Sequence, residues 1–173
     1  FHTLTTYRRL ALHHPAVITS AGTLHNTVQL IMKRVDELRS SLAKNAMLTI
    51  EDFIKGLGKS MDIEIAAVMP KILKRSTDSS SFLVESADNV LQAIIDYASL
   101  GRTLPALLTH IAHRSPGIRA KVAVCLHALI HSKGEEIGCA KDFDGMKAAL
   151  PKLLQDSAPE ARAYSRETVR LLV

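Results

Sequence analysis

Four segments of the chain follow one plan: an apolar helix, a short polar turn and a second apolar helix. Their apolar residues recur at the i, i+3, i+4 and i+7 spacing that gathers them on one face of a helix. The four segments are TVQLIMKRVDELRSSLAKNAMLTI, VMPKILKRSTDSSSFLVESADNVLQAI, LPALLTHIAHRSPGIRAKVAVCLHALI and ALPKLLQDSAPEARAYSRETVRLL. One pair of such helices cannot bury its apolar face alone, so the pairs are expected to stack on one another.

The turns of these segments set the length of the repeat. Aligning them places Arg39, Val84, Arg119 and Arg162 in one column, with a spacing that overlaps the roughly 40–47 residues of HEAT and armadillo units. The alternation of period two that is typical of a strand is not found. The sequence therefore predicts an all-α fold, an α-solenoid of about five HEAT-like repeats, with about nine or ten helices. We expect one domain over residues 1–173.

Prolines and short polar breaks punctuate these helices. Three segments carry a proline in the first helix, at Pro70, Pro105 and Pro151. We expect each of them in the first helical turn, where the missing N–H costs nothing. Breaks rich in Ser, Asp, Pro and Gly, which cap helices and form turns, fall at 13–15, 56–62, 76–81, 99–102, 114–117, 132–138 and 156–159.

The net charge narrows the class of partner. The chain carries a formal charge of +5, which favours an acidic protein, a nucleic acid or an acidic membrane surface. No apolar run approaches the roughly 20 residues that span a bilayer, so no membrane insertion is expected. The chain starts at Phe1 rather than Met, and we expect a piece of a longer multidomain protein whose first repeat is truncated.

The cysteines and histidines do not predict a metal site. Cys125 and Cys139 have neither a disulfide framework nor zinc spacing, and their apolar neighbours predict buried thiols in a reducing compartment. His127 and His131 have the i, i+4 spacing that can hold zinc. However, Ala128 stands where the catalytic version needs an acid, so ordinary helix histidines are expected.

Other candidate chemistry is also weak. The stretch KGLGKS at 55–60 lacks both the spacing and the preceding strand of a phosphate-binding loop. It predicts a helix end with a glycine cap. His110 and His113 flank a turn, where they are expected to make polar contacts. Nothing in the chain argues for catalysis or for a cofactor.

The long segment ELRSSLAKNAMLTIEDFIKGLGKSMDIEIAAVMPKILKRSTDSSSFLVESADNVLQAII resembles the second and third repeats of TOG domains. The resemblance is closest to the branch of the cytoplasmic linker-associated proteins and the ciliary crescerins. RSPGIRAKVAVCLHALI and DSAPEARAYSRETVRLL are similar to the fourth and fifth repeat turns of the family, and TYRRLALHH is similar to the helix that closes its first repeat. The resemblance implies a paddle-shaped HEAT array that binds αβ-tubulin or microtubules through its intra-repeat loops.

Carried over to this chain, the tubulin-binding loops of the family fall at 36–40, 79–84, 114–119 and 157–162. The contact residues that the resemblance implies are Asp36, Arg39, Ser80, Phe82, Arg114, Ser115, Arg119, Lys121, Glu160, Arg162 and Arg166. Arginine suits such a contact because its guanidinium forms bidentate pairs with carboxylates. The recurring arginines can equally bond to carbonyls or to an acidic residue of the next repeat. The non-recurring Arg114 and Lys121 are therefore the better candidates for contact.

Two positions depart from the pattern of the family. The first-loop tryptophan of the family has no counterpart, because the chain contains no Trp and the matching position would fall just upstream of Phe1. The third-loop column holds Val84 beside Glu85, where the family usually offers a basic residue. Both departures concern the affinity for tubulin rather than the fold.

Two other functions stay open at this point. A protein-interaction scaffold of the same fold without tubulin binding would bury Arg39, Arg119 and Arg162 in bonds between repeats. Nucleic-acid binding would use a basic stripe away from the loops, but four Phe and three Tyr provide few stacking platforms, and it is not expected. We expect a monomeric module in the cytoplasm or on the cytoskeleton, including the cilium or axoneme.

Overall fold

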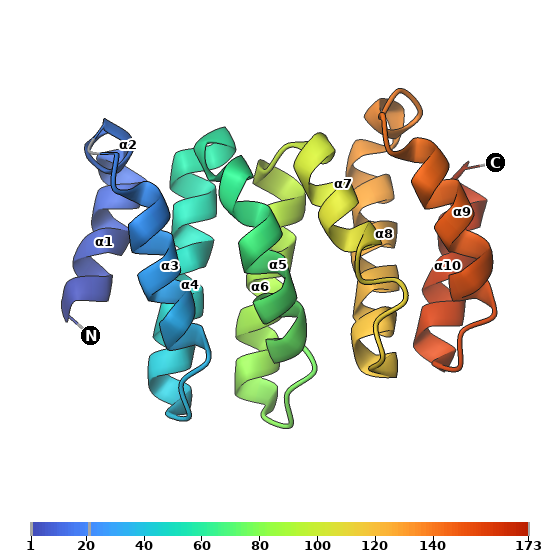
Figure 1. Ribbon diagram of the computed structural model, residues 1–173, viewed down its shortest axis with the longest axis horizontal. Helices are drawn as coiled ribbons and strands as arrows, with labels where there is room; N and C mark the ends of the chain where they lie inside the picture. The colour runs from blue at the N-terminus through green and yellow to red at the C-terminus, as the bar shows by residue number, and fades with distance from the viewer. Residues whose placement is uncertain (1, 21, 173) are drawn as a thin grey trace. The chain divides into compact units, whose positions relative to one another are not determined.

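The computed structural model describes residues 2–20 and 22–172, and all of its regular elements are helices (Figure 1). Its contacts divide the chain into two compact units, an N-terminal unit, Phe1–Ala98, and a C-terminal unit, Ser99–Val173. No strand occurs in the described ranges, which contain ten α-helices. The predicted all-α fold is therefore confirmed.

The N-terminal unit has two layers of helices. Its elements are α1 His2–His13, α2 Pro15–Ser20, α3 Leu24–Val35, α4 Ser40–Leu57, the 3-10 helix η1 Gly58–Glu64, α5 Ile65–Arg75 and α6 Ser81–Tyr97. α3 pairs with α4 and α5 pairs with α6, while α4 also packs against both α1 and α6. In Figure 1, α3 and α5 lie side by side in front of α4 and α6. Each hairpin thus contributes its first helix to one layer and its second helix to the other.

The C-terminal unit repeats this arrangement with two further hairpins. Its elements are α7 Leu100–Leu108, α8 Pro116–Ile137, α9 Phe143–Leu154 and α10 Pro159–Leu172. The second helices α8 and α10 pack along each other, and the first helices α7 and α9 are also in contact. α8 contains a kink at Lys133, where φ is −130° and ψ is 27°. The break expected at 132–138 is therefore a kinked helix end rather than a loop.

The apolar stripes of the sequence form the core of each unit. In α4, Ile50, Phe53 and Ile54 are fully buried, and each such burial contributes about 1.5–3 kcal/mol relative to an exposed side chain. The Phe53 ring meets Tyr7 of α1 edge-on, with the ring centroids 6.3 Å apart. A Cβ at Gly56 would lie 2.1 Å from the carbonyl oxygen of Ala11. A glycine at this position therefore lets α1 approach α4.

The repeated prolines lie deeper in their helices than the sequence analysis expected. Pro70, Pro105 and Pro151 are all inside helices, at the sixth, sixth and ninth positions of α5, α7 and α9. An interior proline leaves the carbonyl four residues earlier without its intrahelical donor. Those carbonyls belong to Ala66, Gly101 and Lys147, and all three residues are exposed. Water can therefore replace the missing bond, which explains why the first-turn prediction was wrong.

Two local predictions have opposite outcomes. α4 ends at Leu57 and its C-cap is Gly58, whose φ of 51° is in the left-handed region that favours glycine, so the predicted glycine cap is confirmed. The prediction of two buried thiols is wrong for one of them, since Cys125 is buried but Cys139 is exposed. Cys139 follows the kinked end of α8, outside the apolar stripe that buries Cys125.

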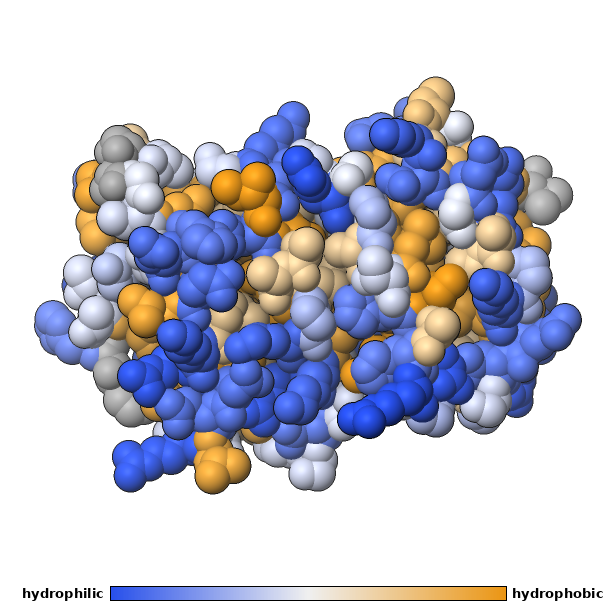
Figure 2. All heavy atoms as spheres, in the orientation of Figure 1, coloured by the Kyte–Doolittle hydropathy of each residue, from blue (hydrophilic) through white to orange (hydrophobic). Residues whose placement is uncertain are grey.

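The hydropathy of the surface over the first helices of the N-terminal unit changes along their length. Figure 2 shows hydrophilic residues gathered over the ends of α3 and α5 that lead into the turns. Large exposed apolar side chains include Leu30, Leu38 and Ile63. None of the helices in the described ranges combines the length and the apolar character needed to cross a membrane.

Candidate functional site: the loop edges of the two units

Four turns join the helices within the hairpins, and they fall at residues 36–39, 76–80, 109–115 and 155–158. We call them the second, third, fourth and fifth loops. The second and third loops lie at one end of the N-terminal unit (Figure 1), and contacts described below tie them together. The fourth and fifth loops are likewise tied together in the C-terminal unit. Each unit therefore has its own loop edge.

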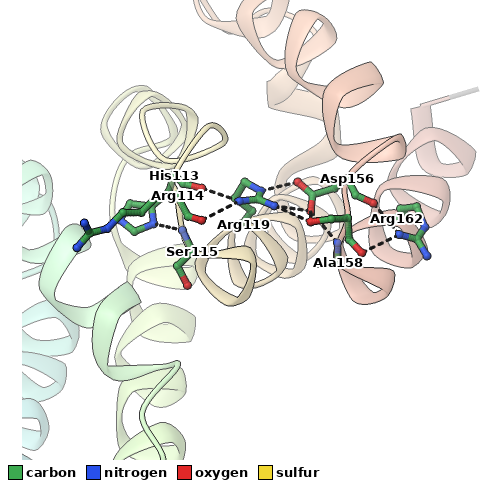
Figure 3. A network of polar contacts seen from close by, with 8 residues as sticks. His113, Arg114, Ser115, Arg119, Asp156, Ala158 and Arg162 are labelled. Carbon is green, nitrogen blue, oxygen red and sulfur yellow. Dashed lines mark hydrogen bonds and ion pairs between the residues drawn. The ribbon is translucent and has the colours of Figure 1, made fainter.

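One arginine joins the two loops of the C-terminal unit (Figure 3). Arg119 of α8 donates from Nε to Asp156 Oδ2 at 2.6 Å and from Nη2 to Asp156 Oδ1 at 3.0 Å. The same guanidinium donates to the Ser157 hydroxyl at 3.0 Å and to the carbonyl of His113 at 2.8 Å. The Arg119 side chain is only 16% exposed. It is therefore committed to holding the fourth and fifth loops together.

The ion pair shifts the ionisation of both partners. Hydrogen bonding to Arg119, followed by the backbone N–H of Ala158, holds the pKa of Asp156 below its usual range despite burial. Hydrogen bonding to Asp156 in turn raises the pKa of Arg119. The Asp156 side chain is 7% exposed, and a carboxylate this buried needs its partners to remain charged. The pair therefore stabilises the loop edge at neutral pH.

In the next hairpin, Arg162 makes the same kind of contact to backbone carbonyls that Arg119 makes. It donates from Nη1 to the carbonyls of Asp156 and Ser157, at 2.6 and 3.0 Å. Arg119 donates in the same way to the carbonyls of His113 and Arg114, at 2.8 and 3.3 Å. In both hairpins the accepting carbonyls lie six and five residues before the arginine. The recurrence of this arginine therefore has a structural cause.

A second recurring contact starts the second helix of three hairpins. The side chain two residues before the N-cap accepts a hydrogen bond from the backbone N–H of the N-cap residue. The contacts are Ser80 N–H to Asp78 Oδ1 at 3.1 Å, Ser115 N–H to His113 Nδ1 at 3.0 Å and Ala158 N–H to Asp156 Oδ1 at 2.8 Å. This bond from Ser80, followed by one from Arg75, lowers the pKa of Asp78. The expected polar contact of His113 is confirmed.

The N-terminal unit ties its loops with residues of a first helix. Arg75, in the last turn of α5, donates to the carbonyls of Val35 and Glu37 at 2.8 and 3.0 Å. It also pairs with Asp78 at 2.9 Å, and its side chain is 15% exposed. Lys71, one turn earlier, donates to Asp36 Oδ2 at 2.6 Å. Asp36 therefore has a partner within the unit.

The structure corrects the register of the aligned column. Arg119 is four residues after the N-cap Ser115, and Val84 is four after the N-cap Ser80. Arg162 is likewise four after Ala158, the residue before α10. Arg39 is itself the N-cap of α4, so the corresponding position in that hairpin is Ala43. The two loops of the N-terminal unit thus lack the recurring arginine, and the placement of Arg39 in the column was wrong.

Several of the predicted contact residues project from the loop edges. Arg39, Arg114, Glu160 and Arg166 are exposed, and Phe82 is 43% exposed. In Figure 3 the guanidinium of Arg114 points away from the Arg119–Asp156 pair. Asp36 is also exposed, although it pairs with Lys71. The other five predicted residues, Ser80, Ser115, Arg119, Lys121 and Arg162, are half-buried. The structure thus divides the predicted set into projecting and enclosed residues.

Phe82 is held in place by a neighbouring cation. The Nζ of Lys44 on α4 lies 3.8 Å from the centroid of its ring, a geometry that is attractive because of the ring's quadrupole. Leu38, at the tip of the second loop, is 99% exposed. The loop edge of the N-terminal unit thus offers apolar as well as basic groups.

The residues that tie these loop edges together were not among the predicted contacts. Asp78 and Asp156 each precede a serine in a Ser-rich or Ser-Ala turn, and this Asp-Ser pair two residues before a helix was a usable signal. Arg75 and Lys71 could be read only as basic residues near a helix C-terminus, where they are generally favourable. Their cross-loop contacts depend on the packing of α5 against α3.

The histidines form no metal site that the described residues reveal, since no group of three or more His, Cys, Asp or Glu side chains is suitably placed in that part of the chain. His127 lies against Tyr164 with ring centroids 5.6 Å apart. The ring centroids of His127 and His131 are 6.4 Å apart, and His131 is exposed. The pair thus has the i, i+4 spacing but an aromatic neighbour instead of a third ligand.

Helical hairpins with ordered intra-hairpin loops define a repeat protein of the HEAT type. Residues 8–173 match the family described as CLASP N terminal, and the chain belongs to this family. It is a TOG domain of the branch that contains the cytoplasmic linker-associated proteins and the crescerins.

Two curated relatives illustrate the match. The chain is 29% identical to TOG array regulator of axonemal microtubules protein 1 of Mus musculus, over 96% of this chain and 10% of that protein. It is 24% identical to Crescerin-like protein che-12 of Caenorhabditis elegans, over 88% of this chain and 12% of that protein. The chain thus spans about a tenth of the length of these relatives.

A solved structure supports the fold. It is described as "Crescerin uses a TOG domain array to regulate microtubules in the primary cilium", and it matches with a TM-score of 0.71 at 17% identity. The match covers 87% of this chain and 62% of that chain. The predicted class, an all-α array of HEAT-like repeats, is confirmed.

Proposed function

We propose that this chain is a microtubule-associated module that binds αβ-tubulin through its intra-repeat loops. Its relatives are named as regulators of axonemal microtubules and as crescerin-like proteins. Arrays of TOG domains regulate microtubules in the crescerin whose solved structure it resembles. We infer the same class of partner, a non-catalytic role and a location on the cytoskeleton, including the cilium.

The observation that carries the proposal is that some arginines are bonded within the loop edges while others remain exposed. Arg119 and Arg162 are used to order the loops, whereas Arg114 and Arg39 remain exposed beside them. A loop that is already ordered loses little conformational entropy on binding, and an exposed guanidinium can pair bidentately with a carboxylate of the partner. Ordered loops with projecting arginines therefore suit the capture of an acidic protein surface.

Gel filtration of the chain with purified tubulin tests the proposal. At tens of micromolar we expect the two to co-migrate as one complex. The double variant Arg39→Ala/Arg114→Ala is expected to weaken binding by about tenfold or more, since truncating an anchoring arginine commonly costs over 1 kcal/mol. Its unfolding curve should be unchanged, because neither side chain makes a hydrogen bond or an ion pair within the described residues.

Arg102 provides a matched control. It is an exposed arginine near the start of α7, at the opposite end of that helix from the fourth loop. Arg102→Ala removes one exposed guanidinium, as each of the two loop substitutions does, and is expected to leave tubulin binding within about twofold. If the wild-type chain does not co-migrate with tubulin, or if Arg102→Ala weakens binding as much as the loop variant does, the tubulin proposal is lost. The protein-interaction scaffold then becomes the better account.

A further inference from the structure

In the second and third hairpins, the first helices α3 and α5 and the second helices α4 and α6 carry opposite charge. The sequences of α3 and α5 contain five basic and no acidic residues: Lys33, Arg34, Lys71, Lys74 and Arg75. Those of α4 and α6 contain two basic and five acidic residues: Lys44, Lys55, Glu51, Asp52, Glu85, Asp88 and Asp96. The formal charge is therefore +5 on α3 and α5 together and −3 on α4 and α6 together (5 − 0 and 2 − 5).

Hydrogen bonds bring the basic residues of α5 beside the end of α3. Lys71 Nζ donates to the carbonyl of Met32 at 3.0 Å, and Arg75 Nε donates to that of Val35 at 2.8 Å. Lys74 lies between these two anchors along α5. The end of α3 carries Lys33 and Arg34. Figure 2 shows hydrophilic residues covering this part of the unit. We call Lys33, Arg34, Lys71 and Lys74 the cationic patch.

Only part of the patch is neutralised by the protein itself. Arg34 pairs with Glu37 at 2.6 Å, and Lys71 pairs with Asp36 at 2.6 Å. Lys33 and Lys74 are exposed, and neither has an ion pair with any other residue that the structure describes. Two adjacent helix ends thus present uncompensated ammonium groups to solvent.

The helix dipole accounts for some of this pattern. Basic side chains are favoured in the last turn of a helix by its dipole, which explains a single Lys or Arg at each end. It does not explain the separation of charge between the first helices α3 and α5 and the second helices α4 and α6, since the last turn of α6 carries no basic residue. A concentrated field of one sign is the arrangement that attracts a ligand of opposite charge.

We propose that the cationic patch, which adjoins the loop edge of the N-terminal unit, binds an acidic, extended polypeptide segment. Successive carboxylates of such a segment can pair with side chains from two neighbouring helices. The sequences of α3 and α5 contain no aromatic residue, so the patch lacks the stacking platforms that single-stranded nucleic acid uses. Charge complementarity therefore selects a glutamate- or aspartate-rich peptide.

Fluorescence anisotropy with a short, labelled Glu/Gly peptide tests the proposal on the whole chain. At low ionic strength we expect saturable binding that is lost in high salt, because exposed ion pairs are screened. Lys33→Ala/Lys74→Ala is expected to weaken binding by about tenfold, at up to about 1 kcal/mol for each pair. Lys33→Arg/Lys74→Arg should retain it.

The control variant is Lys147→Ala/Lys152→Ala, which removes two exposed lysines from α9 of the C-terminal unit. It changes the net charge equally and should bind the peptide within about twofold of wild type. An equal loss in both variants, or no binding by wild type, would overturn the proposal. Stronger, lysine-dependent binding of a single-stranded oligonucleotide or of phosphatidylserine vesicles would overturn it in favour of another anion. The assay contains no tubulin, so its failure is separate from failure of the loop-edge proposal.

Discussion

The two units tie their loops together with arginines that come from different helices. In the C-terminal unit, Arg119 of the second helix α8 reaches forward to Asp156 in the next loop. In the N-terminal unit, Arg75 of the first helix α5 reaches back to the carbonyls of the preceding loop, while Val84 occupies the position that matches Arg119. Adjacent loops are thus joined in both units, by an arginine that reaches to the next loop in one unit and to the preceding loop in the other. A repeat can therefore conserve a contact between its loops without conserving the residue that makes it.

The largest effect should follow from cutting the tie of the C-terminal unit. Arg119→Ala leaves the 7% exposed carboxylate of Asp156 without its charged partner, and it removes bonds to Ser157 and to His113. We expect a loss of about 2–4 kcal/mol in the free energy of unfolding, measured by urea denaturation. Arg119→Lys, which keeps the charge but not the bidentate geometry, should lose less. A change below about 0.5 kcal/mol would show that the pair is not structural.

Cutting the tie of the N-terminal unit should cost somewhat less. Arg75→Ala removes the bonds to Val35 and Glu37 and the pair with Asp78. Asp78 keeps the backbone N–H of Ser80, so its carboxylate stays partly satisfied. We expect a loss of about 1.5–3 kcal/mol. Hydrogen exchange should increase in the second and third loops and should stay unchanged in the fifth. Faster exchange in all loops would contradict a tie confined to this unit.

Low pH should weaken both the Arg119–Asp156 contact of the C-terminal unit and the Arg75–Asp78 contact of the N-terminal unit. The pKa values of Asp156 and Asp78 are both lowered in the folded chain, so each carboxylate contributes stability above the unfolded-state pKa of about 3.9. That contribution is lost as the pH falls from about 5 through the folded-state pKa. Because Arg119 is the first cause of the shift of Asp156, Arg119→Ala should flatten the loss of stability with acid. Chemical denaturation at a series of pH values measures this, and an unchanged slope would refute the assignment.

The smallest expected effect concerns the fourth loop, which uses a histidine where the third and fifth use an aspartate. The backbone N–H of Ser115 donates to Nδ1 of His113. His113→Asp should place a charged acceptor at a helix N-terminus and raise the free energy of unfolding by about 0.5–1 kcal/mol. His113→Ala, which removes the acceptor, should lower it by a similar amount. The same sign for both variants would show that the side chain does not act as a cap.

Much of the fold could be predicted from the sequence because helix periodicity is local. The stripes through Ile65, Val68 and Ile72, and through Val122, Leu126 and Leu129, are all buried as expected. The depth of the prolines could not be predicted. It depends on whether the carbonyl that loses its donor faces water, as at Ala66, and this is set by packing.

The site was predictable only in part. Arg114 was predicted as a contact residue, and it is exposed at the end of the fourth loop, just before the N-cap Ser115. Arg119 was predicted as a possible structural residue as well as a contact. The tie made by Arg75 depends on which loop α5 packs against, and no local pattern reports that. The register of Arg39 could not be predicted from the polar turns alone, because the turns do not show where each helix begins. The cap geometry gives that position.

The most direct test of the account is a hydrogen-exchange footprint of tubulin on the chain. The account predicts that added tubulin slows exchange in the four loops, at residues 36–39, 76–80, 109–115 and 155–158, and at the first turns of the helices that follow them. The middle of α4 and of α8 should be unaffected. Protection that is absent from the loops, or that appears instead on the exposed faces of the helices, would contradict the claim that the loop edges are the tubulin-binding site.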